Sequence, residues 1–176
     1  MATIWKLDPT HSEVSFKVKH LVITTVTGYF RSFDSTVETD DDSDFSSAKV
    51  EFLIDTTSID TNQADRDGHL KSADFFDAEN HPKITFRSTS LERKSDDEYV
   101  LNGDLTIRGT THPVKFDVEF GGTVTDPYGN FKAGFEVSGK ISRKAFGLTW
   151  SAVTEAGAVV VSDDVKIQAS VQFVKQ

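Results

Sequence analysis

The sequence contains no cysteine, which excludes a disulfide framework, a thiol nucleophile and a thiolate metal site. No apolar run approaches the roughly 20 residues that a membrane-spanning helix requires. The first residues lack the basic and apolar regions of an export signal. We therefore expect a cytoplasmic protein, or a periplasmic one if the N-terminus is truncated.

Positive charge is also scarce, because 19 Lys and Arg stand against 28 Asp and Glu and give a net charge of −9. Phosphate recognition needs clustered basic side chains, so no nucleic-acid partner is expected. The cluster of Asp40, Asp41, Asp42 and Asp44 is interpreted as a solvated turn, with weak calcium binding as the alternative. It lacks the spaced ligands and the glycine of a calcium loop.

Histidine shows no metal-ligand spacing either, and no metal site or cofactor is predicted. The five residues are scattered along the chain, at His11, His20, His69, His81 and His112.

Phenylalanine, in contrast, occurs 14 times, which suits a β-protein whose interior is filled or lined by rigid rings. Most of the chain alternates apolar and polar residues with a period of two, which is typical of strands with one buried face. The segments with this pattern are 14–18, 28–37 with a bulge, 48–54, 84–89, 99–107, 114–120, 131–141 and 165–173.

About eight to ten antiparallel strands joined by short loops are expected, in a single domain that spans residues 1–176. An antiparallel sheet of this size must hide its edges, and closure into a β-barrel does so. The predicted fold is therefore all-β, a closed antiparallel barrel, with a sandwich as the alternative. The alternation does not decide whether the interior is solid or hollow.

A short helical insert is predicted near residues 60–77, where the alternation stops. Asp60 followed by Gln63 is a plausible helix start, because each side chain can accept from a free backbone N–H of the first turn. Gly68 weakens the helix and limits its length.

The densest charged patch, around Arg66 and Asp67, leaves two interpretations open. In a hydrolase or isomerase, Asp67 would work with His20 or His69. In a purely structural role, Arg66 or Asp67 ties the insert to the barrel wall. Arg143, at the end of a predicted strand, could pair with such a carboxylate or meet a ligand headgroup.

Several sequence blocks follow one another along nearly the whole chain. They are Trp5-x-Leu7-Asp8-Pro9-x-His11-Ser12, Phe16-x-Val18-Lys19-His20, Gly28-x-Phe30-x-x-Phe33, Ser58-Ile59-Asp60-Thr61, Arg66-Asp67-x-His69-Leu70-Lys71-Ser72-x-Asp74-Phe75-Phe76-Asp77, Pro82-x-Ile84-x-Phe86-x-Ser88, Gly103-Asp104-Leu105-Thr106-Ile107-Arg108-Gly109 and Arg143-x-x-Phe146-Gly147. Together these blocks resemble the YceI-like polyisoprenoid-binding family.

This resemblance implies a lipocalin-like barrel whose pore holds a polyisoprenoid, an isoprenoid quinone or a similar lipid, often as a dimer. It implies no catalysis, and a role in carriage, storage or stress-related sequestration follows. A solid-core interaction module is the alternative. Leu53 and Val100, expected to be exposed, mark a candidate dimer face.

The predicted ligand-binding residues fall into an apolar and a polar set. The apolar set, expected to line the pore or form plain core, is Phe16, Val18, Phe30, Phe52, Ile54, Phe75, Phe76, Phe86, Leu105, Phe116, Phe135, Val137 and Ile141. The polar set, expected near the lipid's polar end, is His20, Arg66, Asp67 and Arg143.

Overall fold

The computed structural model describes residues 2–21, 23–40, 44–150 and 161–176, and these form an eleven-stranded antiparallel sheet with one α-helix. The strands are β1 (Thr3–Leu7), β2 (Glu13–His20), β3 (Thr24–Phe30), β4 (Phe33–Thr39), β5 (Lys49–Asp55), β6 (Ile59–Asp60), β7 (Lys83–Arg93), β8 (Glu98–Ile107), β9 (Thr110–Thr125), β10 (Phe131–Ser142) and β11 (Val161–Lys175). The helix α1 spans Ala64–Lys71, and three 3-10 turns are η1 (Pro9–His11), η2 (Thr56–Ser58) and η3 (Lys144–Phe146).

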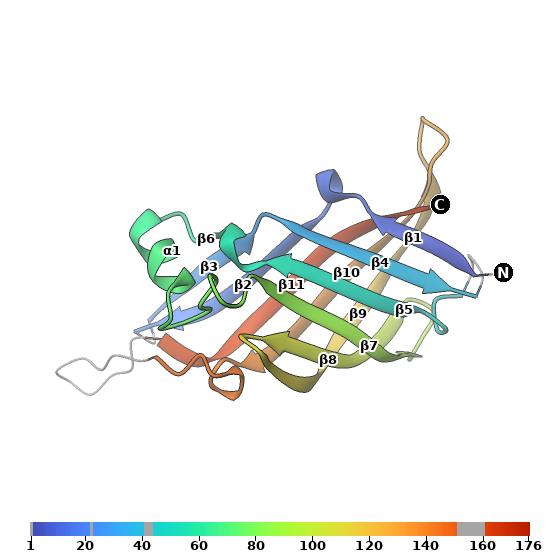
Figure 1. Cartoon of the computed structure of the whole chain (residues 1–176). Helices are drawn as coiled ribbons and strands as arrows, with labels where there is room; N and C mark the ends of the chain where they lie inside the picture. The colour runs from blue at the N-terminus through green and yellow to red at the C-terminus, as the bar shows by residue number, and fades with distance from the viewer. Residues whose placement is uncertain (1, 22, 41–43, 151–160) are drawn as a thin grey trace.

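Eight strands close into a barrel in the order β1-β4-β5-β7-β8-β9-β10-β11. The ring closes where β1 pairs with β11, with Trp5 opposite Lys175 and Leu7 opposite Phe173. Strands β2, β3 and β6 continue the wall from the other part of β11. Figure 1 shows the long strands wrapping around one axis. The prediction of a closed antiparallel barrel is confirmed.

The segment predicted as one bulged strand over residues 28–37 is in fact two strands, β3 and β4, and that prediction was wrong. The chain leaves the ladder at Arg31 and Ser32 because β3 pairs with β2 while β4 pairs with β1. The backbone groups at this break bond elsewhere. Arg31 N–H donates to the Ser58 carbonyl (3.1 Å), and Asp55 N–H donates to the Ser32 carbonyl (3.0 Å).

The helix begins later than the sequence indicates. Its N-cap is Gln63, whose side-chain oxygen accepts from Arg66 N–H, and the first helical residue is Ala64. Asp60 instead belongs to β6 and accepts from Arg31 Nε (3.1 Å). In Figure 1, α1 and β6 lie at the end of the barrel opposite to the two chain termini. Within the described ranges, no helix is long and apolar enough to cross a membrane.

Of the two positions expected on an exposed dimer face, Val100 is only 2% exposed, so that expectation was wrong for it. Leu53 is half-buried. Val100 lies between Glu92 of β7 and Asp117 of β9. Leu53 lies between Asp34 of β4 and Thr85 of β7. Cross-strand neighbours on one face of a sheet are close enough to shield one another from solvent. A homodimer stays a prediction.

Five aromatic rings pack across the barrel end that carries the termini, and we call them the aromatic plug: Trp5, Phe45, Phe120, Phe131 and Phe135. Ring centroids lie 5.2 Å apart for Trp5 and Phe45, 5.8 Å for Trp5 and Phe131, and 5.1 Å for Phe45 and Phe135. Trp5 is fully buried, and its indole N–H donates to the Thr39 hydroxyl (3.1 Å). The plug gives this end a dense core.

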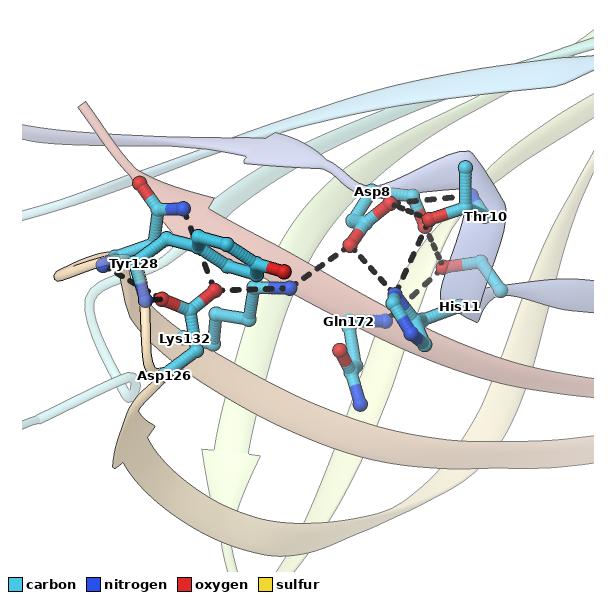
Figure 2. A network of polar contacts seen from close by, with 9 residues as sticks. Asp8, Thr10, His11, Asp126, Tyr128, Lys132 and Gln172 are labelled. Atoms are coloured by element: carbon cyan, nitrogen blue, oxygen red, sulfur yellow. Dashed lines mark hydrogen bonds and ion pairs between the residues drawn. The ribbon is translucent and has the colours of Figure 1, made fainter.

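A network of polar contacts next to the plug joins η1 to the β9–β10 hairpin (Figure 2). The Asp8 carboxylate accepts from the Thr10 hydroxyl (2.6 Å), contacts His11 Nδ1 (2.9 Å) and pairs with Lys132 Nζ (3.0 Å). Lys132 also lies 3.5 Å from an oxygen of Asp126, in the turn between β9 and β10. One lysine thus links both segments.

The pKa of Asp8 is lowered well below its usual range. The main cause is the hydrogen bond from the Thr10 side chain, and His11 and Lys132 lower the pKa further, while burial opposes them. The ionised carboxylate is therefore the form that stabilises the fold.

We predict that Asp8→Asn lowers the free energy of unfolding at neutral pH. A group with a lowered folded-state pKa stabilises the fold above its unfolded-state pKa, here 3.8, and loses that contribution as the pH falls below it. The difference between wild type and variant in urea unfolding should therefore shrink as the pH drops below 3.8. Asp117→Asn, at an exposed position on β9, is the control. A difference that does not vary with pH would contradict this account.

Candidate functional site

The inward side chains do not fill the barrel. They leave a cavity of about 220 Å³ that runs along the interior. This is larger than the engineered cavity of about 150 Å³ that holds a benzene molecule. It is smaller than the roughly 300–1,000 Å³ of pockets for drug-sized ligands. The interior therefore has room for a slender molecule, and the cavity disfavours a solid-core module.

The structure places every residue of the predicted apolar set, and Arg143, on the wall of this cavity. These residues are Phe16, Val18, Phe30, Phe52, Ile54, Phe75, Phe76, Phe86, Leu105, Phe116, Phe135, Val137, Ile141 and Arg143. His20, Arg66 and Asp67 do not line it. That any residue of the apolar or the polar set binds a ligand stays a prediction.

Other lining residues were not selected from the sequence. Ile84 and Leu101 share the inward parity of their strands, so the alternation contains the signal for them. Leu91 has the opposite parity to Ile84, because the register of β7 shifts between Ser88 and Ser90. Phe45 and Leu148 lie outside the strands, where a period of two carries no information. Such positions can be recognised only from the folded chain.

The cavity differs at its two ends. At one end it reaches Phe45 and Phe135, which belong to the aromatic plug. At the other end it is bordered by Leu70 of α1 and by Phe75 and Phe76, which follow the helix. Leu70 and Phe76 are half-buried. The two ends therefore differ in what closes them, packed aromatic rings at the plug end and the helical insert at the α1 end.

Trp150 supports the wall at the α1 end, although the sequence analysis did not identify it. Its ring centroid lies 5.3 Å from that of Phe75 and 4.9 Å from that of His69. Arg108, in the β8–β9 turn, donates to the carbonyls of Phe75 (3.1 Å) and Gly147 (3.4 Å). The insert is thus held against the chain that follows β10.

Arg143 is 3% exposed, and its guanidinium is occupied by backbone carbonyls. Nη1 donates to Leu148 (2.6 Å) and Trp150 (2.7 Å), Nε to Ser162 (2.8 Å) and Nη2 to Val161 (3.1 Å). These carbonyls belong to two chain segments, which Arg143 joins. Its position on the cavity wall therefore reflects a structural role.

Asp163 compensates the charge of this arginine. Burial lowers the pKa of Arg143, and the Asp163 carboxylate opposes that effect. Burial alone would raise the pKa of Asp163, but hydrogen bonds from the Ser142 hydroxyl (2.7 Å) and Lys144 N–H (3.0 Å) lower it. Both groups are consequently ionised, and neither leaves an uncompensated charge beside the cavity.

Arg66 and Asp67 tie α1 to the end of β6. An Asp67 oxygen accepts from the N–H (2.8 Å) and the hydroxyl (2.5 Å) of Thr61. Arg66 donates from Nε to the same hydroxyl (2.8 Å) and from Nη2 to the Thr61 carbonyl (2.5 Å). The structural interpretation of this patch accounts for all of these contacts.

The carboxylate–histidine pairs of the enzyme alternative do not form. His69 Nε2 lies 2.9 Å from a carboxylate oxygen of Asp74, not of Asp67. His20 is the last residue of β2.

No cluster of metal-ligating side chains occurs among the described residues. Asp41 and Asp42 of the predicted acidic turn lie outside that part of the chain.

The cavity offers almost no polar group to a ligand. Among the described residues on its wall, only Ser15 carries a hydroxyl, which donates to the Gln168 carbonyl (3.5 Å). Across the described residues, every buried side-chain nitrogen or oxygen has a hydrogen-bond partner. Apolar cavities of this kind stay dry and accept apolar guests.

A family described as the YceI-like domain matches residues 5–173. A UPF0312 protein of Staphylococcus epidermidis is 42% identical over 173 residues, and the match covers 97% of each chain. Among solved structures, Burkholderia cenocepacia BcnA is 23% identical, with a TM-score of 0.81 over 94% of this chain and 98% of that one. A Saccharophagus degradans domain, described as polyisoprenoid-binding, is 15% identical, with a TM-score of 0.73 over 98% of both chains.

We predict that Arg143→Lys lowers the free energy of unfolding by about 1.5–3 kcal/mol, because an ammonium cannot reach all four carbonyls of the two segments. Arg87→Lys, at a side chain that is 77% exposed, should change it by less than about 0.5 kcal/mol. Urea unfolding measures both. If Arg143→Lys instead left stability intact and weakened ligand binding, Arg143 would be a headgroup contact rather than a structural one.

Proposed function

The chain belongs to the YceI-like family, and from this premise we propose that it binds one long apolar lipid inside the barrel. The ligand class is a polyisoprenoid, an isoprenoid quinone or a similar chain. The observation that carries the proposal is the cavity between α1 and the aromatic plug, whose wall is apolar except for engaged polar groups. The description of the Saccharophagus degradans neighbour as polyisoprenoid-binding supports it.

The energetics of such a site favour length over chemical detail. Each buried CH₂ group is worth about 0.8 kcal/mol, so ten buried carbons give a gross gain of about 8 kcal/mol. Association and ordering cost about 4–15 kcal/mol, so a short chain binds weakly and a long one binds well. A site without free polar groups therefore selects long, apolar chains.

The lipid would enter at the α1 end, with its tail directed towards Phe45 and Phe135. Its polar end would then lie near α1, where Arg66 is exposed. Of the predicted headgroup residues, Arg66 has the most accessible position, whereas Arg143 is occupied by carbonyls. His20 and Asp67 are weaker candidates, because both are half-buried whereas Arg66 is exposed; none of the three lines the cavity.

The proposal is binding without catalysis. Asp67 accepts hydrogen bonds from Thr61 and His69 pairs with Asp74, so both are used in holding the insert. A protein of this kind would carry, store or sequester its lipid.

We predict that Phe52→Asp reduces the affinity for a long-chain isoprenol at least about 100-fold, or about 2.7 kcal/mol. The change places a carboxylate on the cavity wall, where an apolar chain would have to cover it. Among the described lining residues the charged group is Arg143, whose guanidinium is already engaged by carbonyls. A radiolabelled isoprenol retained by the protein through gel filtration measures binding.

The matched control is Leu53→Asp, the next residue on β5, which points to the opposite face of the sheet and does not line the cavity. It should bind as the wild type does. Undiminished binding by a folded Phe52→Asp variant would place the ligand elsewhere, and failure of the wild type to bind would overturn the proposed function.

A further inference from the structure

Three phenylalanine rings on the cavity wall lie over glycines of neighbouring strands. The pairs are Phe16 of β2 with Gly28 of β3, Phe86 of β7 with Gly103 of β8, and Phe116 of β9 with Gly139 of β10. All three rings line the cavity and are at least nine-tenths buried.

The rings occupy the space that a side chain at each glycine would need, and at Gly103 the backbone carbonyl oxygen of Arg87 occupies it as well. A Cβ added to Gly28 would lie 2.2 Å from the nearest ring carbon of Phe16, and one on Gly139 would lie 2.3 Å from Phe116. Carbon atoms in contact are normally about 3.5–4.0 Å apart. Each ring therefore reaches into the place of the missing side chain, over the backbone of the next strand.

Backbone conformation does not explain these glycines. The glycines that have a left-handed φ are Gly109, Gly122, Gly129 and Gly147, and none of the three belongs to that group. Another residue could adopt the backbone at Gly28, where the three nearest atoms to an added Cβ all belong to the Phe16 ring. Glycine is required at position 28 because the Phe16 ring leaves no room for a side chain there.

We propose that Gly28, Gly103 and Gly139 are specificity-determining residues that keep the cavity wide enough for a methyl-branched chain. This inference rests on the proposed function. With a larger residue at these positions, each ring would have to turn into the lumen. An isoprenoid chain carries a methyl group on every fourth backbone carbon and is wider than a straight alkyl chain. A narrower cavity would therefore exclude the isoprenoid before it excludes the straight chain.

The clearest test is Gly28→Ala, because the atoms it displaces are ring atoms rather than backbone. Forcing extra atoms into a packed apolar site costs about 1–3 kcal/mol, which corresponds to about 5- to 150-fold in affinity. The affinity for a radiolabelled long-chain isoprenol should fall by about tenfold or more. The affinity for a straight-chain fatty alcohol of equal carbon number should change less than about threefold.

A second substitution should restore the width. In Gly28→Ala combined with Phe16→Leu, the ring is absent, and the preference for the isoprenol should return. Gly134→Ala on β10 is the matched control, since an added Cβ there meets no atom closer than 4.0 Å. It should bind both chains as the wild type does. If Gly28→Ala does not fold, Gly139→Ala takes its place.

The outcomes separate this inference from the function on which it rests. A wild type that binds neither chain overturns the proposed function. A wild type that binds the isoprenol, with a folded Gly28→Ala that binds it equally well or loses both chains equally, overturns the role of the glycines alone. A selective loss of the isoprenol, reversed by Phe16→Leu, supports it.

Discussion

The pairing of β1 with β11 is the interaction on which the rest of the structure depends. It closes the ring, so that the backbone groups of the eight barrel strands bond to neighbours on both sides and no open edge crosses the wall there. Closure separates an inner from an outer face along each strand, and the alternating sequence makes the inner face apolar. Trp5 belongs to β1 and packs against Phe45, so the same closure also positions the aromatic plug at one end of the cavity.

The interior of a barrel of this size could be filled by side chains. It is hollow because of where its inward side chains lie. The Phe16 and Phe116 rings lie over glycines instead of crossing the lumen. The polar groups at both ends are occupied, with Lys132 joining two carboxylates near the plug and Arg143 joining two chain segments near α1. What remains for a ligand is apolar surface, and such surface recognises a chain by its length and width.

Much of this could be predicted from the alternation of residues, because a period of two assigns each strand residue to one face. Phe86, Leu105 and Val137 were placed on the cavity wall in this way. The parts that could not be predicted depend on contacts distant in sequence. The carbonyls that occupy Arg143 come from the loop after η3 and from the first residues of β11, and they leave no sequence signal. Gln63 rather than Asp60 caps α1 because β6 retains Asp60. Hollowness depends on the orientation of rings over glycines in neighbouring strands, which no single strand encodes.

The central claim is that the interior holds one long apolar chain, and mass spectrometry tests it most directly. The protein would be purified without detergent, weighed in its native state, and then extracted with organic solvent. The account predicts one long-chain isoprenoid, quinone or comparable lipid per barrel, present on purification or taken up when an isoprenoid is added. A bare protein mass that persists after incubation with added isoprenoids would contradict it.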